Sequence, residues 1–235
     1  MKNDPALFSA TELLVAFQNK TLSPVEATEA VLARIEKFNP VFNAFRIVDP
    51  EKALADARKS EERWVRRSPC GLTDGIPTTI KDLVDTKGWS TRRGSLTTSD
   101  EGSWENDAPL VARLREHGAV LLGKTTTPEF GWKGVTDSPL TGITRNPWNP
   151  AKTPGGSSGG AAAAAAACLG ALHHGSDGGG SIRMPSGYTG IYGLKPTFGR
   201  VPTWPASGFG TLSHQGPMTR TVSDAALMLT VMAEA

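Results

Sequence analysis

Apolar residues recur at helical spacing through the first part of the chain. Two capping boxes, Ser9 with Glu12 and Ser23 with Glu26, each stand directly before such an apolar face. A further stretch rich in Ala, Lys and Glu follows them. We therefore expect residues 1–65 to form a helical N-terminal scaffold.

The pattern changes after this block to short apolar runs broken by Gly, Pro, Asp and Thr. Ile76–Ile80 and Ala119–Leu122 have the length and composition of buried strands, and Leu110–His117 between them has a helical pattern. Such alternation predicts an α/β fold. We expect the α/β core to occupy residues 66–220, and the capped apolar segment 221–235 to form a terminal helix.

Composition bounds the class of protein. With 235 residues, 38% apolar and 20% charged residues, the chain is typical of one folded domain, 1–235, rather than of a disordered protein. Its 25 basic and 23 acidic residues are scattered, which predicts neither a nucleic-acid nor a membrane surface. Without a signal-peptide pattern, a cytoplasmic location is expected. Cys70 and Cys168 lack a CxxC partner, so we expect two buried, reduced thiols.

The first of two short motifs is a P-loop pattern. Residues 118–125 fit GxxxxGK[ST], but Ala119–Leu122 is itself the expected strand, whereas a P-loop follows its strand. A structural role, or one that supports a site without touching the substrate, is therefore predicted for Lys124.

The second motif is the nucleophile-elbow pattern GxSxG at residues 155–159, with Asp177 and His214 following in the required order. An elbow follows a buried strand. Here three prolines in the nine residues 146–154 exclude a central strand at that place.

Better support for acyl-transfer chemistry comes from two separate segments. Gly178-Gly179-Gly180 precedes Ser181, and consecutive glycines can turn their backbone N–H groups into one concavity that stabilises an oxyanion. No histidine is well placed as a base. Lys81, directly after the strand Ile76–Ile80, can serve if burial lowers its pKa from about 10.4 toward neutrality.

Four motifs, taken together, identify a family. Ile80-Lys81-Asp82-Leu83, the GGSSGG loop at 155–160, the segment DGGGSIRMPS at 177–186 and GLKPT at 193–197 resemble the amidase signature family in order and spacing. The resemblance runs from about Ser9 to the last residue. It implies the amidase signature fold, a mixed β-sheet core covered by α-helices.

The resemblance also implies a Ser-cisSer-Lys triad in place of Ser-His-Asp. By position, Ser181 is the expected nucleophile, Ser157 the bridging serine after a cis peptide bond with Gly156, and Lys81 the base. The family also implies oxyanion donors, a serine that orients the lysine and a pair that holds the loop. The oxyanion donors are expected to be the backbone amides of Gly178, Gly179, Gly180 and Ser181. Ser158 is the serine expected to orient the lysine, and Asp177 with Arg183 is the pair expected to hold the loop. The expected substrate is a small-molecule amide, with no cofactor and no metal.

Two local departures and the length of the chain qualify the resemblance. Thr126-Thr127 stands where many members have Asn-Met beside the cleft, and Gly178 replaces a bulkier residue. The chain has about half the length of the family's enzymes, so the fold is expected to be incomplete, with the C-terminal half absent. Either that half or a second copy of the chain is expected to cover the apolar terminal helix.

Three functions stay open at this point. The first is an amidohydrolase that converts carboxylic amides to carboxylate plus ammonia or amine through an acyl-enzyme. The second is the transamidating component, the A subunit, of a glutamine-dependent tRNA amidotransferase, which requires partner subunits and makes no direct contact with nucleic acid. The third is a non-catalytic fragment whose uncovered apolar face causes aggregation or self-association.

Overall fold

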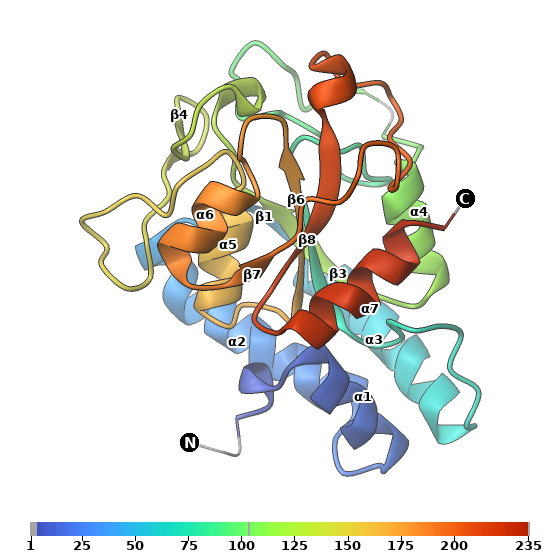
Figure 1. The fold of residues 1–235 in the computed structure, drawn as a ribbon. Coiled ribbons are helices and arrows are strands. Elements are labelled where there is room, and N and C mark those ends of the chain that lie inside the picture. The colour runs from blue at the N-terminus through green and yellow to red at the C-terminus, as the bar shows by residue number, and fades with distance from the viewer. Residues whose placement is uncertain (1–3, 103, 235) are drawn as a thin grey trace.

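Helices and strands alternate along the chain around one mixed sheet in the computed structural model, which describes residues 4–102 and 104–234 (Figure 1). The helices are η1 (Pro5–Leu7), α1 (Ala10–Gln18), α2 (Pro24–Phe42), α3 (Pro50–Val65), α4 (Pro109–Glu116), η2 (Glu129–Gly131), α5 (Gly159–Ala166), α6 (Arg183–Thr189), η3 (Gly210–Leu212) and α7 (Val222–Met232). The strands are β1 (Phe45–Val48), β2 (Pro77–Lys81), β3 (Val120–Thr125), β4 (Asp137–Ser138), β5 (Gly142–Ile143), β6 (Leu172–Asp177), β7 (Tyr192–Gly193) and β8 (His214–Thr219).

The main sheet has six strands in the order β1-β3-β2-β6-β8-β7. β2 pairs in parallel with β3 and with β6, whereas β1, β7 and β8 are antiparallel to their neighbours. This arrangement confirms the predicted α/β fold with a mixed sheet. Because β2 and β6 run in the same direction, their carboxyl ends, Lys81 and Asp177, lie toward the same edge of the sheet.

Successive side chains of β3 point to opposite faces of this sheet and pack in two different hydrophobic clusters. Leu121 packs in the cluster that α1, α4 and α7 cover, while Val120 and Leu122 pack in the cluster covered by α2, α3 and α5. All three side chains are fully buried. A strand buried on both faces explains the continuous apolar run that predicted it.

The alanine-rich helix α5 lies inside the protein except at its last residue, Ala166. Its residues from Gly159 to Ala165 are all buried, and a Cβ atom on Gly160 would lie 2.5 Å from the backbone nitrogen of Thr126. Small side chains therefore let this helix approach the sheet closely, and the GGSSGG loop leads directly into its N-terminus.

Both capping boxes form as predicted, at Ser9 with Glu12 and at Ser23 with Glu26. The N-terminal block also contains β1, which the helical pattern did not predict. Both cysteines are free, as expected, but their expected burial is wrong, because Cys70 is exposed and Cys168 is only half-buried.

Candidate active site

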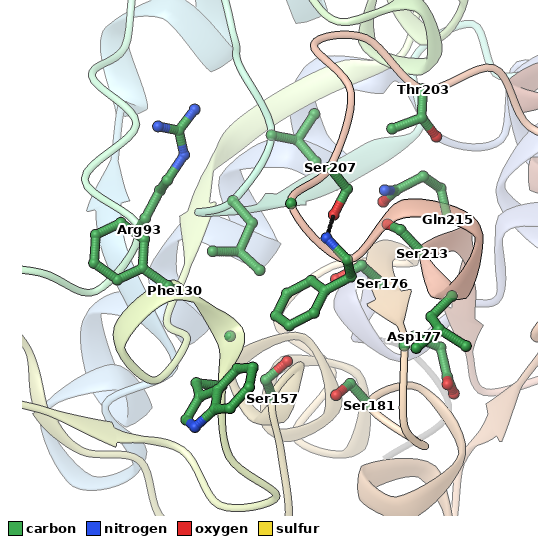
Figure 2. A pocket seen from close by; sticks show the side chains of 18 of the residues that line it. Arg93, Phe130, Ser157, Ser176, Asp177, Ser181, Thr203, Ser207, Ser213 and Gln215 are labelled. Carbon is green, nitrogen blue, oxygen red and sulfur yellow. Dashed lines mark hydrogen bonds between the residues drawn. The ribbon is translucent and has the colours of Figure 1, made fainter.

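A cavity of about 760 Å³ opens at the edge of the sheet where β2 and β6 end (Figure 2). Ser157 and Ser181 both line it, together with Gly178 and Gly179 of the glycine loop. The segment 130–134 and the segment 202–213 before β8 supply most of the remaining wall. The cavity thus joins residues that lie far apart in the sequence.

Lys81 lies beneath this cavity at the end of β2 and is completely buried. Its Nζ atom lies 2.7 Å from Oγ of Ser157, 2.9 Å from Oγ of Ser158 and 3.0 Å from Oγ of Ser176. The structure therefore brings together three of the predicted residues, Lys81, Ser157 and Ser158. Ser176 was not predicted, although its position directly before Asp177 on one strand was a usable signal.

The hydrogen bonds of Ser158 determine what Lys81 can do at each hydroxyl. The Ser158 hydroxyl donates to the backbone carbonyl of Ser176 at 3.1 Å and accepts from the backbone N–H of Ser176 at 3.2 Å. Its one proton is thus already used, so it can only accept from the lysine. A neutral amine has two N–H donors and one lone pair. Donation to Ser158 and Ser176 leaves that lone pair for the proton of Ser157.

Burial favours the neutral form of this lysine. Loss of hydration lowers the pKa of Lys81 from 10.5 to about 7, and the carboxylate of Asp177 opposes the shift without reversing it. A lysine with a pKa near 7 is poised to act as a general base at neutral pH.

The peptide bond between Gly156 and Ser157 is cis, as the resemblance implied. A Cβ atom on Gly156 would lie 2.6 Å from the backbone carbonyl carbon of Val135. Only glycine fits at this contact, and its close packing fixes the backbone that carries Ser157.

Asp177 organises the glycine loop. Its carboxylate accepts hydrogen bonds from the backbone N–H groups of Gly180 at 2.7 Å and Ile182 at 3.1 Å, and from the guanidinium of Arg183 at 2.9 Å. Although burial alone raises the pKa of Asp177, these donors lower it to about 2. The loop is therefore tied to a permanent negative charge, and the pairing expected for Asp177 and Arg183 forms.

The same bonds divide the four predicted oxyanion donors into two groups. The N–H of Gly180 is engaged with Asp177. Across the described residues, the N–H groups of Gly178, Gly179 and Ser181 have no hydrogen-bond acceptor. Three amides of this loop are thus free to bind an oxyanion.

Ser181 links the two loops through its backbone. Its carbonyl accepts from the N–H of Ser158 at 3.2 Å, and its half-buried side chain lines the cavity. Within the described chain, its hydroxyl makes no hydrogen bond to Ser157 or to any other group. Figure 2 shows both serine hydroxyls at the same end of the cavity.

Other residues from the sequence motifs are placed elsewhere. Nδ1 of His214 contacts the backbone carbonyls of Asp177 and Leu212, not a serine, and residues 146–154 directly before the GxSxG motif form no strand. Lys124 lies within β3 and pairs with Asp82 at 3.2 Å, which agrees with a structural role. Thr126 and Thr127 are buried and do not line the cavity, so their expected position beside the cleft is wrong.

The side chains of the described residues contain no group of three or more His, Cys, Asp or Glu arranged to hold a metal ion. None of the helices in that part of the chain is long and apolar enough to cross a bilayer.

Comparisons with known proteins identify the family that the chain resembles. Residues 26–235 match the family model described as Amidase. The chain is 45% identical to an acylamidase of Rhodococcus erythropolis over 96% of this chain and 47% of the relative. It is also 45% identical to the A subunit of the glutamyl-tRNA(Gln) amidotransferase of Methylococcus capsulatus, over 94% of this chain and 46% of the relative.

Solved structures show the same likeness. A bacterial aryl acylamidase, described as belonging to the amidase signature enzymes family, superposes with a TM-score of 0.90 at 34% identity, covering 97% of this chain and 48% of that one. The chain therefore spans about half the length of the relatives it matches.

Proposed function

The chain belongs to the amidase signature family, and on that premise we propose that it hydrolyses the C–N bond of carboxylic amides through an acyl-enzyme on Ser181. The products are a carboxylate and ammonia or an amine. The observation that carries this proposal is the contact of 2.7 Å between the buried amine of Lys81 and the hydroxyl of Ser157.

The proposed reaction begins with a proton relay. Neutral Lys81 takes the proton of Ser157, and Ser157 takes the proton of Ser181 as the Ser181 oxygen bonds to the amide carbon. Reversal of the relay delivers that proton to the leaving nitrogen when the C–N bond breaks. Water then attacks the ester carbon with the same groups acting as base, which releases the carboxylate and restores Ser181.

The glycine loop is proposed to stabilise the negative charge that develops on the carbonyl oxygen. The free N–H groups of Gly178, Gly179 and Ser181 are the donors, and each such donor is worth about 2.7–4 kcal/mol in comparable enzymes. Gly180 acts through Asp177 instead, because its N–H helps to hold the shape of the loop.

The relay requires Ser181 and Ser157 to approach during catalysis. The absence of a hydrogen bond between these hydroxyls without substrate is compatible with the mechanism, because such contacts commonly tighten only when substrate is bound. Both side chains line the same cavity, so they can approach each other within it.

The wall of the cavity supports a substrate with an apolar group. Trp132 and Phe209 stack at its mouth with ring centroids 5.8 Å apart and planes 13° apart. Phe130, Met184 and Leu212 also line the cavity. An aryl or alkyl amide can bury its apolar part against these side chains.

A fluorophosphonate probe tests the proposed nucleophile directly. We expect a covalent adduct on Ser181, found by peptide mapping, that disappears in Lys81→Ala because the relay has lost its base. An adduct on Ser157 alone would instead support a nucleophile elbow, and no adduct at pH 8 on a folded chain would support the non-catalytic fragment.

The similarity to a component of an amidotransferase supports a second candidate function. In this role the same triad releases ammonia from glutamine for partner subunits. Hydrolysis of simple amides by the chain alone would favour the amidohydrolase, whereas ammonia release from glutamine only with partners present would favour the amidotransferase role.

A cooperative, monomeric thermal unfolding transition would argue against an unstable fragment.

A further inference from the structure

Gln215 presents a polar side chain to the cavity that the proposed proton relay does not use. It lies on β8 directly opposite Ser176 of β6, and Ser176 in turn contacts the amine of Lys81. Its side chain lines the cavity and is only 6% exposed (Figure 2).

His174 holds the carboxamide of Gln215 from behind. Nε2 of His174 lies 2.9 Å from Oε1 of Gln215, and both residues are buried. Nδ1 of the same ring lies 3.4 Å from the backbone nitrogen of Lys81. The imidazole thus connects the cavity wall with the strand that carries the proposed base.

The identity of each donor and acceptor fixes the direction of the hydrogen bonds from Lys81 through His174 to Gln215. A backbone N–H can only donate, so Nδ1 of His174 accepts from Lys81 and carries no proton. A neutral imidazole then has its proton on Nε2, which must donate to Gln215. Of the two carboxamide atoms only Oε1 can accept, so the NH₂ group faces the other way.

The neutral state of His174 follows from its surroundings. Complete burial lowers the pKa of His174 from 6.5 to about 3, and the neighbouring lysines Lys81 and Lys124 add to the shift. Among the described residues, the NH₂ group of Gln215 has no acceptor within the protein. A buried side chain that lines a cavity and carries an N–H group without an acceptor in the described protein can donate that hydrogen bond to a ligand.

We propose that Gln215 determines substrate specificity by donating a hydrogen bond from its NH₂ group to an acceptor atom in the part of the substrate beyond the scissile amide. The proposal rests on the proposed function, because it assumes that this cavity binds amides. His174 is the positioning residue, since its N–H prevents the carboxamide from turning over. Amides with a carbonyl, ether or ring-nitrogen acceptor are the preferred class.

Binding to Ser181→Ala isolates this contact from catalysis. The ligands are three aromatic carboxamides. Benzamide carries no further polar group, 3-aminobenzamide adds a hydrogen-bond donor, and a pyridine carboxamide adds an acceptor. The pyridine carboxamide is whichever of nicotinamide and isonicotinamide binds more tightly. Dissociation constants from titration calorimetry at pH 8 then report on Gln215 through their ratios.

Two substitutions of Gln215 in that background separate shape from polarity. Gln215→Glu keeps an oxygen for His174 but has no N–H, and Gln215→Met keeps the length without either group. We expect the preference for the pyridine carboxamide over benzamide to fall by about 2- to 10-fold in both variants, the range of one hydrogen bond. Gln215→Glu should in addition gain preference for 3-aminobenzamide.

His174→Phe tests the orientation itself. With Gln215 intact but free to turn over, the preference for the acceptor-bearing ligand should fall, but by less than in Gln215→Met, which has no N–H. Should this buried substitution prevent folding, the two Gln215 variants decide alone.

Unchanged ligand ratios in both Gln215 variants would overturn the proposal, and so would failure of every amide to bind the parent. Selective binding without hydrolysis by the parent with Ser181 restored would refute the proposed function and leave the role of Gln215 standing.

Discussion

The Nζ atom of Lys81 lies 2.7 Å from Oγ of Ser157, although 76 residues separate them in the sequence. The lysine is completely buried, and among the described residues its amine makes hydrogen-bond contacts with this serine, with Ser158 and with Ser176. In the proposed mechanism, the charge state of this amine decides whether a base is available.

The rate of acylation should follow this charge state. Because burial lowers the pKa of Lys81 to about 7, the neutral fraction falls about tenfold for each pH unit below 6 and is nearly complete above pH 8. We expect kcat/KM for a simple amide to rise with one ionisation near pH 7 and then level off. A profile that is flat between pH 5.5 and 9 would exclude Lys81 as the base.

Folding stability should respond to the same group. The folded state releases the lysine proton near pH 7, whereas the unfolded chain keeps it up to about 10.5, so the unfolded state binds more protons between these values. Stability of the wild type should therefore increase relative to Lys81→Met as pH rises from 7 toward 10. Urea unfolding of both proteins at pH 7, 8 and 9 measures the difference, in which the contribution of Lys124 cancels. A difference that does not change with pH would contradict the lowered pKa.

Ser158 should matter more than Ser176 for the base. Ser158→Ala removes an acceptor of Lys81 and also leaves the backbone N–H and carbonyl of Ser176 without their partner. We expect kcat to fall about 10- to 100-fold, which corresponds to loss of a buried hydrogen-bonded group. Ser176→Ala removes the 3.0 Å contact alone and serves as the comparison. Equal effects of the two substitutions would contradict the assigned donor pattern.

Much of the architecture was predictable where a local rule decides the outcome. Capping boxes mark helix starts through bonds within four residues, and the short apolar run at 119–122, bounded by Gly118 and Gly123, is typical of a buried strand. β1 was not predictable, because a segment of four residues becomes a strand only through its partner, β3. β8 contains Pro217 and lies in a segment that its composition marks as irregular.

The candidate site divides in the same way. Motif order places the proposed triad, and the position of Ser176 directly before Asp177 marks it as a residue of the same strand. That Ser176 reaches Lys81 and that Gln215 meets His174 depends on how β6 pairs with its neighbours. The amide of Gly180 is the clearest example. Gly180 is the same residue type as Gly178 and Gly179, and only the hydrogen bond from its N–H to the carboxylate of Asp177 distinguishes it from them.

Two glycines near the site should differ sharply in tolerance. A Cβ atom on Gly156 would lie 2.6 Å from the backbone of Val135, whereas one on Gly179 would meet nothing within 4 Å. Gly156→Ala should cost about 1–3 kcal/mol of stability and most of the activity, because relief of the clash moves Ser157. Gly179→Ala should leave the unfolding free energy nearly unchanged. Similar denaturation midpoints for the two variants would show that the packing at Gly156 is less strict than the structure indicates.

Trp132 should affect substrate binding and not folding. Its side chain is 78% exposed and stacks on Phe209 at the mouth of the cavity. Trp132→Ala should raise KM for an aryl amide severalfold, with a much smaller effect on acetamide, since only the larger substrate reaches the stacked rings. Thermal unfolding measured in parallel provides the control. An equal rise of KM for both amides would count against contact of the aryl group with this side chain.

The buried alanines of α5 have a consequence for how the gene can vary. Most single-base changes in an alanine codon that alter the residue lengthen the side chain or give it a charge, and every residue from Gly159 to Ala165 is buried, so either change must displace neighbouring atoms. Overpacking a core commonly costs about 1–3 kcal/mol, a large part of the stability of an ordinary domain. The stretch of lowest sequence complexity is thus expected to be among the slowest to diverge.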